Sequence, residues 1–123
     1  MKKIIASPNA PAAIGPYSQA VEAGGTLYVS GQLPVNPKTG EIPEGIEAQT
    51  RQSLTNVTAI LKEAGLGPNN VVKTCVLLQH IGDFAAMNAV YAEFFPEDKP
   101  ARVCYEVAAL PKGALVEIDA IAV

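Results

Sequence analysis

The chain has 123 residues and a formal net charge of −3, with 49 % hydrophobic and only 17 % charged residues. This length suits one domain, residues 1–123, and the hydrophobic content excludes a disordered chain. The negative charge and the lack of lysine or arginine runs argue against a nucleic-acid partner. No stretch is long and apolar enough for a signal peptide or a membrane span, so we expect a cytoplasmic protein without a membrane partner.

The first third of the chain alternates in residue character with the period of β-strands. The expected strands cover residues 2–6, 17–23 and 26–30, and a Gly24-Gly25 turn joins the last two. Residues 34–45 contain three prolines and two glycines, which predicts a loop.

The period changes between residues 46 and 64, where apolar residues recur at helical spacing. Leu54, Val57, Ile60, Leu61 and Ala64 form the apolar stripe. The polar residues expected on the opposite side are Gln49, Arg51, Gln52, Asn56, Lys62 and Glu63. Gly65 follows directly and is typical of a helix C-terminus.

The next segment predicts a central strand and a second helix. Residues 71–78 are apolar and rich in β-branched side chains, which is typical of a buried strand. Asp83 is placed to cap a helix over residues 84–95, which Pro96 ends. Its expected buried face consists of Phe84, Met87, Val90, Tyr91 and Phe94, with Phe95 as a further candidate.

Two last strands, residues 100–107 and 115–118, are expected to pair as a hairpin around Pro111-Lys112-Gly113. In the first strand Arg102, Cys104 and Glu106 share one face, and Glu117 and Asp119 share a face of the second. A hairpin would set an arginine and several carboxylates on a single sheet face. Such a face is either a functional site or a solvated surface with weak ion pairs.

The element order β-β-β-α-β-α-β-β predicts an α+β fold, with a mixed six-stranded sheet and two helices on one face. The other face of the sheet then lacks a cover within the chain. A second subunit would supply that cover, which agrees with the low content of charged residues.

Motifs along nearly the whole chain resemble those of one family. Its C-terminal signature matches Pro100-Ala101-Arg102, Cys104 and Val116-Glu117-Ile118, and further matches are Ala13 to Ser18, Ser30-Gly31-Gln32 and Asn88. These motifs are similar to those of the Rid (YjgF-type) family of enamine and imine deaminases, some of which have been described as translation inhibitors or endoribonucleases. The resemblance implies a chorismate-mutase-like fold and a homotrimer with its sites in the clefts between subunits.

Two residues carry the chemistry that this resemblance implies. Arg102 would bind the carboxylate of a 2-imino or 2-keto acid through two parallel hydrogen bonds. The alternative is a structural ion pair with Glu106 or Asp119. Glu117 would handle water and protons during imine hydrolysis, because burial and the nearby Asp119 would each raise its pKa. The alternative is a carboxylate that only orients Arg102.

The other residues that match the family's cleft are Tyr17, Ser30, Gly31, Asn88 and Cys104. Cys104 would act through its backbone, because the single histidine, His80, stands at no spacing that could activate a thiol. Without the resemblance, Tyr17 would be interpreted as a core residue and Asn88 as a helix-surface residue.

Cofactors are not expected. The glycines do not form a nucleotide-binding fingerprint, and the two cysteines and one histidine cannot supply the usual zinc ligands. In the reducing cytosol Cys75 and Cys104 should be free thiols.

The sequence therefore predicts a deaminase that converts small 2-imino acids into 2-keto acids and ammonia. One alternative is a non-catalytic regulatory protein that binds keto acids or related carboxylates, which would need Arg102 but not Glu117. An endoribonuclease is a further alternative, against which the negative charge and the missing histidine argue.

Overall fold

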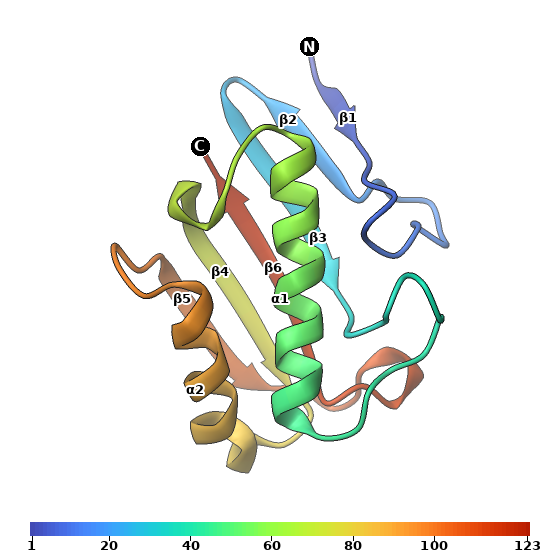
Figure 1. Ribbon diagram of the computed structural model, residues 1–123, viewed down its shortest axis with the longest axis vertical. Helices are drawn as coiled ribbons and strands as arrows, with labels where there is room; N and C mark the ends of the chain where they lie inside the picture. The colour runs from blue at the N-terminus through green and yellow to red at the C-terminus, as the bar shows by residue number, and fades with distance from the viewer.

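A computed structural model describes all residues from 1 to 123. It contains six strands and two α-helices, which follow one another in the expected order (Figure 1). The strands are β1 (Lys3–Ile5), β2 (Ala20–Ala23), β3 (Thr26–Gln32), β4 (Val71–Leu78), β5 (Ala101–Glu106) and β6 (Val116–Ala122). The helices are α1 (Ile46–Glu63) and α2 (Phe84–Phe94), with short 3-10 turns at Pro68–Asn70, Ile81–Asp83 and Pro111–Gly113. No helix is long and apolar enough to cross a membrane.

All six strands form one mixed sheet in the order β1-β2-β3-β6-β4-β5. Strands β4 and β5 run parallel, and every other neighbouring pair is antiparallel. Both helices cover the same face of this sheet, as Figure 1 shows. The predicted α+β class, with a mixed six-stranded sheet and two helices on one face, is confirmed.

The predicted hairpin between the last two strands is wrong. β4 lies between β5 and β6, so these two strands are not neighbours. The physical reason is the crossover through α2, since parallel strands need a long connection and this one places β5 on the outer side of β4. β6 then pairs with the remaining side of β4. The alternating pattern of a strand does not specify its partner.

Helix α1 packs on the core as its apolar stripe predicts. Leu54, Val57, Ile60 and Leu61 are all essentially inaccessible to solvent. Gly65 follows the helix with a φ of 77°, a left-handed conformation that favours glycine. Two polar residues expected on the outer side, Gln49 and Asn56, are instead buried, because each bonds to a neighbouring loop.

Helix α2 departs from its prediction at its first turn. The Asp83 side chain makes no capping hydrogen bond, and Phe84 keeps 39 % of its surface exposed. Met87, Val90, Tyr91 and also Phe95 are buried as expected, and Phe94 is partly buried. An aromatic side chain therefore remains accessible at the start of α2.

The sheet face away from the helices carries exposed apolar residues. Ile4, Tyr28, Val103 and Tyr105 lie on this face, which we call the open face, and each is between 43 % and 52 % exposed. The opposite face carries the core, including Val76, Ile118 and Ala120. No segment of the chain covers the open face in the way that the helices cover the core.

Candidate active site

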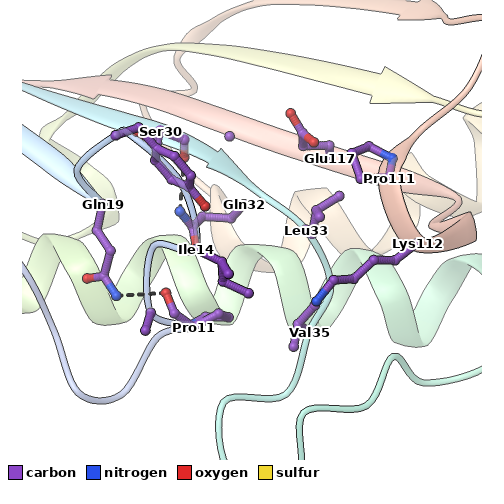
Figure 2. Close-up of a pocket in the computed structure, with 13 residues that line it drawn as sticks. Pro11, Ile14, Gln19, Ser30, Gln32, Leu33, Val35, Pro111, Lys112 and Glu117 are labelled. Atoms are coloured by element: carbon purple, nitrogen blue, oxygen red, sulfur yellow. Dashed lines mark hydrogen bonds between the residues drawn. The ribbon is translucent and has the colours of Figure 1, made fainter.

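A pocket of about 520 Å³ opens at the end of β3 and the start of β6 (Figure 2). We call it the Glu117 pocket. It is lined by Pro11, Ala12, Ile14, Tyr17, Gln19, Ser30, Gly31, Gln32, Leu33, Val35, Pro111, Lys112 and Glu117. Four of the residues that sequence reasoning selected, Tyr17, Ser30, Gly31 and Glu117, therefore meet in one place.

The N-terminal wall of the pocket is fixed by the buried side chain of Gln19. Its Oε1 accepts the Ser7 N–H at 2.6 Å, and its Nε2 donates to the Pro11 carbonyl at 2.8 Å, the bond drawn in Figure 2. The Gln19 side chain thus occupies backbone groups of residues 7 and 11, which are then not available to pair with residues 17–19. The strand predicted from residue 17 therefore begins only at residue 20, and the segment before it is a loop. Tyr17 thus lies on the pocket wall, half exposed, rather than in the core.

The opposite wall is held by polar residues of α1 that sequence reasoning placed on the outer side. The Asn56 Nδ2 donates to the carbonyls of Leu33 and Val35 at 3.1 and 2.9 Å. The Gln49 Oε1 accepts the Leu115 N–H at 2.7 Å, just before β6. A signal for Asn56 existed, because it precedes Ile60 by four residues and so shares the edge of the apolar stripe.

The Glu117 side chain occupies the space that a side chain at position 31 would fill. A register shift in β3 between Val29 and Gln32 brings Gly31 against the Glu117 side chain. A Cβ atom at position 31 would overlap the Glu117 Oε2 and would lie 3.0 Å from the Glu117 Cδ, which is tighter than nine in ten such contacts. Gly31 therefore makes room for the carboxyl group.

The Glu117 carboxyl group is half-buried and has no ion-pair partner within 4 Å, since the only salt bridge in the chain joins Arg51 and Glu93. Burial raises the pKa of Glu117, and the charge of Asp119 raises it further. Burial also raises the pKa of Asp119, although its Oδ1 accepts the Cys75 N–H at 3.0 Å, which favours the charged form. Of the two carboxyls, only Asp119 has a hydrogen bond that stabilises its anion.

Ser30 belongs to the pocket wall through its backbone and its hydroxyl group. The Ser30 Oγ donates to the Ser18 carbonyl at 2.6 Å, and its N–H bonds to the Gln19 carbonyl at 2.9 Å. The hydroxyl group thereby ties the loop that carries Tyr17 to β3.

Arg102 lies elsewhere, beneath α2, in a group of side chains that we call the Arg102 cluster. Its Nη1 donates to the Asn88 Oδ1 at 2.7 Å, and its guanidinium carbon lies 4.7 Å from the Tyr91 ring centre and 5.5 Å from that of Phe84. The Tyr91 hydroxyl is in turn 2.7 Å from the Thr74 Oγ1. The guanidinium is held in place, and its remaining N–H groups make no hydrogen bond within the chain.

Cys104 is on the same face as Arg102 and packs partly buried against the core. Burial raises the pKa of its thiol, and the charge of Arg102 opposes this shift only partly. A protonated thiol is a weak nucleophile, which agrees with the expectation that its side chain does no chemistry.

Glu106 shares the face of Arg102 as predicted, but the predicted placement of Glu117 and Asp119 on that same face is wrong. The register aligns Arg102 with Thr74 on the helix-covered face, whereas Glu117 aligns with Leu77 on the open face. Neither alternative ion pair of Arg102 forms, and Glu106 accepts the Ile81 N–H instead. The seven selected residues thus form two separate groups, with Arg102, Asn88 and Cys104 apart from the Glu117 pocket.

No group of three or more histidine, cysteine, aspartate or glutamate side chains is arranged so that it could hold a metal ion. The side chains of the two groups offer carboxyl, guanidinium, hydroxyl and amide functions. Such groups can bind a small carboxylic acid and transfer protons.

A mixed six-stranded sheet with two helices on one face, a pocket beside Glu117 and a fixed arginine agree with the Rid (YjgF-type) class of α+β proteins that the sequence motifs resemble. The chain belongs to the family described as Endoribonuclease L-PSP, which matches residues 7–123. The YjgF gene product of Escherichia coli superposes with a TM-score of 0.96, at 54 % identity and over 98 % of both chains. E. coli TdcF, solved with bound serine, gives a TM-score of 0.96 at 48 % identity, again over 98 % of both chains.

Two further relatives match along nearly their full length. The 2-iminobutanoate/2-iminopropanoate deaminase of E. coli strain K12 is 56 % identical over all of this chain and 98 % of its own length. A RutC family protein of Pyrococcus horikoshii is 57 % identical over 99 % of this chain and 98 % of its own length. The resemblance to the Rid family seen in the sequence is confirmed.

Proposed function

We propose that this protein hydrolyses 2-imino acids and their enamine tautomers to 2-keto acids and ammonia. The observation that carries the proposal is the half-buried Glu117 carboxyl group, whose pKa is raised and which faces a pocket without an ion-pair partner. Full-length relatives named 2-iminobutanoate/2-iminopropanoate deaminase support the same reaction.

Glu117 would serve as acid and base in this reaction. Water adds to the C=N carbon and gives a carbinolamine, after which the nitrogen takes up a proton and leaves as ammonia while the C=O bond forms. A carboxyl group with a raised pKa can accept a proton from water and return it to nitrogen near neutral pH. Gly31 leaves the space that this carboxyl group requires.

Arg102 would hold the substrate carboxylate. Its guanidinium is already fixed by Asn88 and by the ring of Tyr91, so little rotational freedom is lost when a ligand binds. A bidentate bond to a carboxylate would also orient the neighbouring imine carbon. The Cys104 backbone lies two residues along the same strand and would line the same part of the site.

Because Arg102 and Glu117 lie on opposite faces of one sheet, we propose that the complete site forms between two copies of the chain. β5 is an edge strand, so the Arg102 cluster is available to a neighbouring copy. The apolar open face supports the homotrimer that the sequence led us to expect, since burying Tyr28, Val103 and Tyr105 would stabilise it. All six strands share one sheet, which supports residues 1–123 as one domain.

The test is complementation between two inactive variants. Arg102→Ala and Glu117→Gln proteins are each prepared, then unfolded and refolded together so that mixed oligomers form. Each pure variant should have little activity on 2-iminobutanoate generated in situ by an amino-acid dehydratase. The mixture should regain a substantial part of wild-type activity, because some interfaces then carry an intact Arg102 opposite an intact Glu117.

Refolding each variant alone is the control for recovery, and light scattering checks that every sample has the same oligomeric state. A mixture without activity, although it contains mixed oligomers, would contradict a site shared between two copies, and wild-type activity in either pure variant would exclude a role for that residue. A wild-type protein that does not accelerate imine hydrolysis at all would contradict the proposed reaction itself.

The non-catalytic alternative shares Arg102 and the pocket, and it predicts keto-acid binding without turnover. The family description names endoribonuclease activity, which a purified sample can be tested for directly. The negative net charge argues against a nucleic-acid partner. The cytoplasmic location and the independence from cofactors stay predictions.

A further inference from the structure

We propose that Lys112 is a second anion-binding group of the Glu117 pocket, and that the pocket accepts 2-imino acids whose side chain ends in a carboxylate. This inference rests on the proposed function and specifies the substrate class of the same site. The α-carboxylate would remain with Arg102 of a neighbouring copy, and Lys112 would bind the distal carboxylate.

The first observation is the distribution of charge around the pocket. Of the lining residues, only Glu117 and Lys112 carry charge. Figure 2 shows them at different parts of the pocket: the Glu117 carboxyl points away from Lys112, whose side chain extends across to the opposite wall and ends beside Val35. A substrate whose imine carbon is next to Glu117 would extend its side chain toward the ammonium group.

The second observation is the surface between the two charges. Leu33 lies between Glu117 and Lys112 in Figure 2, and Ile14 approaches from the N-terminal loop. These apolar side chains can pack against the methylene groups of a substrate, but they provide no hydrogen-bonding or charged partner for a polar group. A distal carboxylate would therefore find its partner only at the end of the wall, at Lys112.

The pocket is also larger than a minimal substrate requires. Its volume of about 520 Å³ lies in the range typical of pockets for drug-sized ligands, about 300–1,000 Å³. The substrate 2-iminopropanoate has only a methyl group beyond its imino acid moiety. The space toward Lys112 would be left to solvent unless a longer side chain enters it.

Lys112 is available for an anion, because it makes no side-chain hydrogen bond and no salt bridge within the chain. Its backbone φ of 60° is left-handed, one of two such non-glycine residues in the chain. Pro111 precedes it and Gly113 follows it, also at positive φ, so a tight turn sets the starting point of the side chain. In a protein of net charge −3, this ammonium also offsets the repulsion of a doubly charged substrate.

The experiment compares two imino acids of equal chain length, 2-iminoglutarate and 2-iminopentanoate, generated in situ from glutamate and norvaline by amino-acid oxidases. The quantity measured is the ratio of their kcat/KM values. Lys112→Met keeps an unbranched side chain of similar length and the same backbone preference, so the turn should survive. We expect this variant to lower the ratio about tenfold, the effect of one charge-assisted contact in a partly desolvated site. Lys112→Glu should lower it further.

Lys38→Met is the matched control, because it removes the same charge from an exposed loop outside the pocket. It should leave the ratio at its wild-type value. An unchanged ratio in Lys112→Met, or an equal decrease in Lys38→Met, would overturn the inference and leave Lys112 a surface side chain that covers an apolar wall.

Failure of the proposed function gives a different result, since the wild-type protein would then accelerate hydrolysis of neither imino acid. In that case calorimetry decides the role of Lys112 by comparing 2-ketoglutarate with 2-ketopentanoate. Lys112→Met should weaken binding of the dicarboxylate about tenfold relative to the monocarboxylate. Equal changes for the two ligands would overturn the inference in this assay as well.

Discussion

Arg102 and Glu117, which the sequence brings to within fifteen residues of each other, lie on opposite faces of the sheet. β4 separates their two strands, and the Arg102 side chain lies under α2 while Glu117 lines a pocket beside Gly31. The site that we propose therefore takes Arg102 from one copy of the chain and Glu117 from another. Every variant should therefore be compared at equal oligomeric state.

Removing the guanidinium should weaken ligand binding strongly. Arg102→Ala loses a charge-assisted bidentate contact of about 2–4 kcal/mol, which corresponds to a roughly 30- to 1,000-fold weaker Kd for 2-ketobutyrate. Calorimetry measures this directly. Arg102→Lys should restore binding poorly, because an ammonium lacks the planar pair of donors. Loss of turnover with binding intact would show that another group holds the carboxylate.

Glu117→Gln should separate binding from chemistry. The amide keeps the shape of the side chain and a hydrogen-bonding group but cannot exchange a proton. The variant should bind 2-ketobutyrate while its rate of imine hydrolysis falls roughly 10²- to 10⁴-fold. Near-normal turnover in an assembled Glu117→Gln protein would exclude the acid and base role.

The same substitution should stabilise the fold at neutral pH. Burial and Asp119 raise the pKa of Glu117 in the folded state, so the folded protein binds this proton more tightly than the unfolded chain. The carboxylate is thus unfavourable above its folded pKa, and that cost disappears as the pH falls toward the unfolded value of about 4.3. Glu117→Gln should have a higher Tm than wild type at neutral pH, and the difference should shrink toward acidic pH.

The exposed Glu44→Gln is the control for a simple change of net charge. It should not reproduce the pH-dependent difference in Tm.

Asp119→Asn should lower the pKa of Glu117 and move the basic limb of the pH–rate profile to lower pH, since the neighbouring negative charge is removed. A profile that does not move would show that Asp119 has no influence on Glu117.

Gly31→Ala should inactivate the protein through Glu117. The added Cβ would lie 3.0 Å from the Glu117 Cδ, so the carboxyl group must move from its position in the pocket. A displacement of this size commonly costs about 100-fold in rate. Gly82→Ala is the matched control, because its Cβ would meet no atom within 4 Å and should leave turnover unchanged. Wild-type turnover in Gly31→Ala would mean that the Glu117 position is not critical.

Cys104→Ala should retain turnover. Burial raises the pKa of the Cys104 thiol, so little thiolate is present at neutral pH, and no histidine lies in the Glu117 pocket or the Arg102 cluster. The assay is imine hydrolysis on a protein of confirmed oligomeric state. A variant that folds and assembles but loses all activity would assign a direct chemical role to the sulfur.

The local patterns of the sequence determined the elements. Alternation along residues 71–78 and the apolar stripe of Leu54, Val57 and Leu61 depend only on the geometry of a strand and a helix, which is the same in every fold. The motif around Arg102 and Glu117 indicated the family and the candidate site residues. The strand expected from residue 17 begins at Ala20, where the Gln19 side chain bonds to backbone groups of the preceding loop, and β6 continues to Ala122, beyond its expected end.

Only the tertiary structure decided which residues meet. The alternation of β5 and β6 specifies two faces for each strand, but strand neighbours are chosen by the crossover through α2, which depends on residues far away in the chain. Asn56 is polar by sequence and buried in the fold, because the carbonyls of Leu33 and Val35 satisfy it there. Arg102 and Glu117 are separated for the same reason: hydrogen-bonded pairing across β4 fixes their faces, and pairing is a property of the whole sheet.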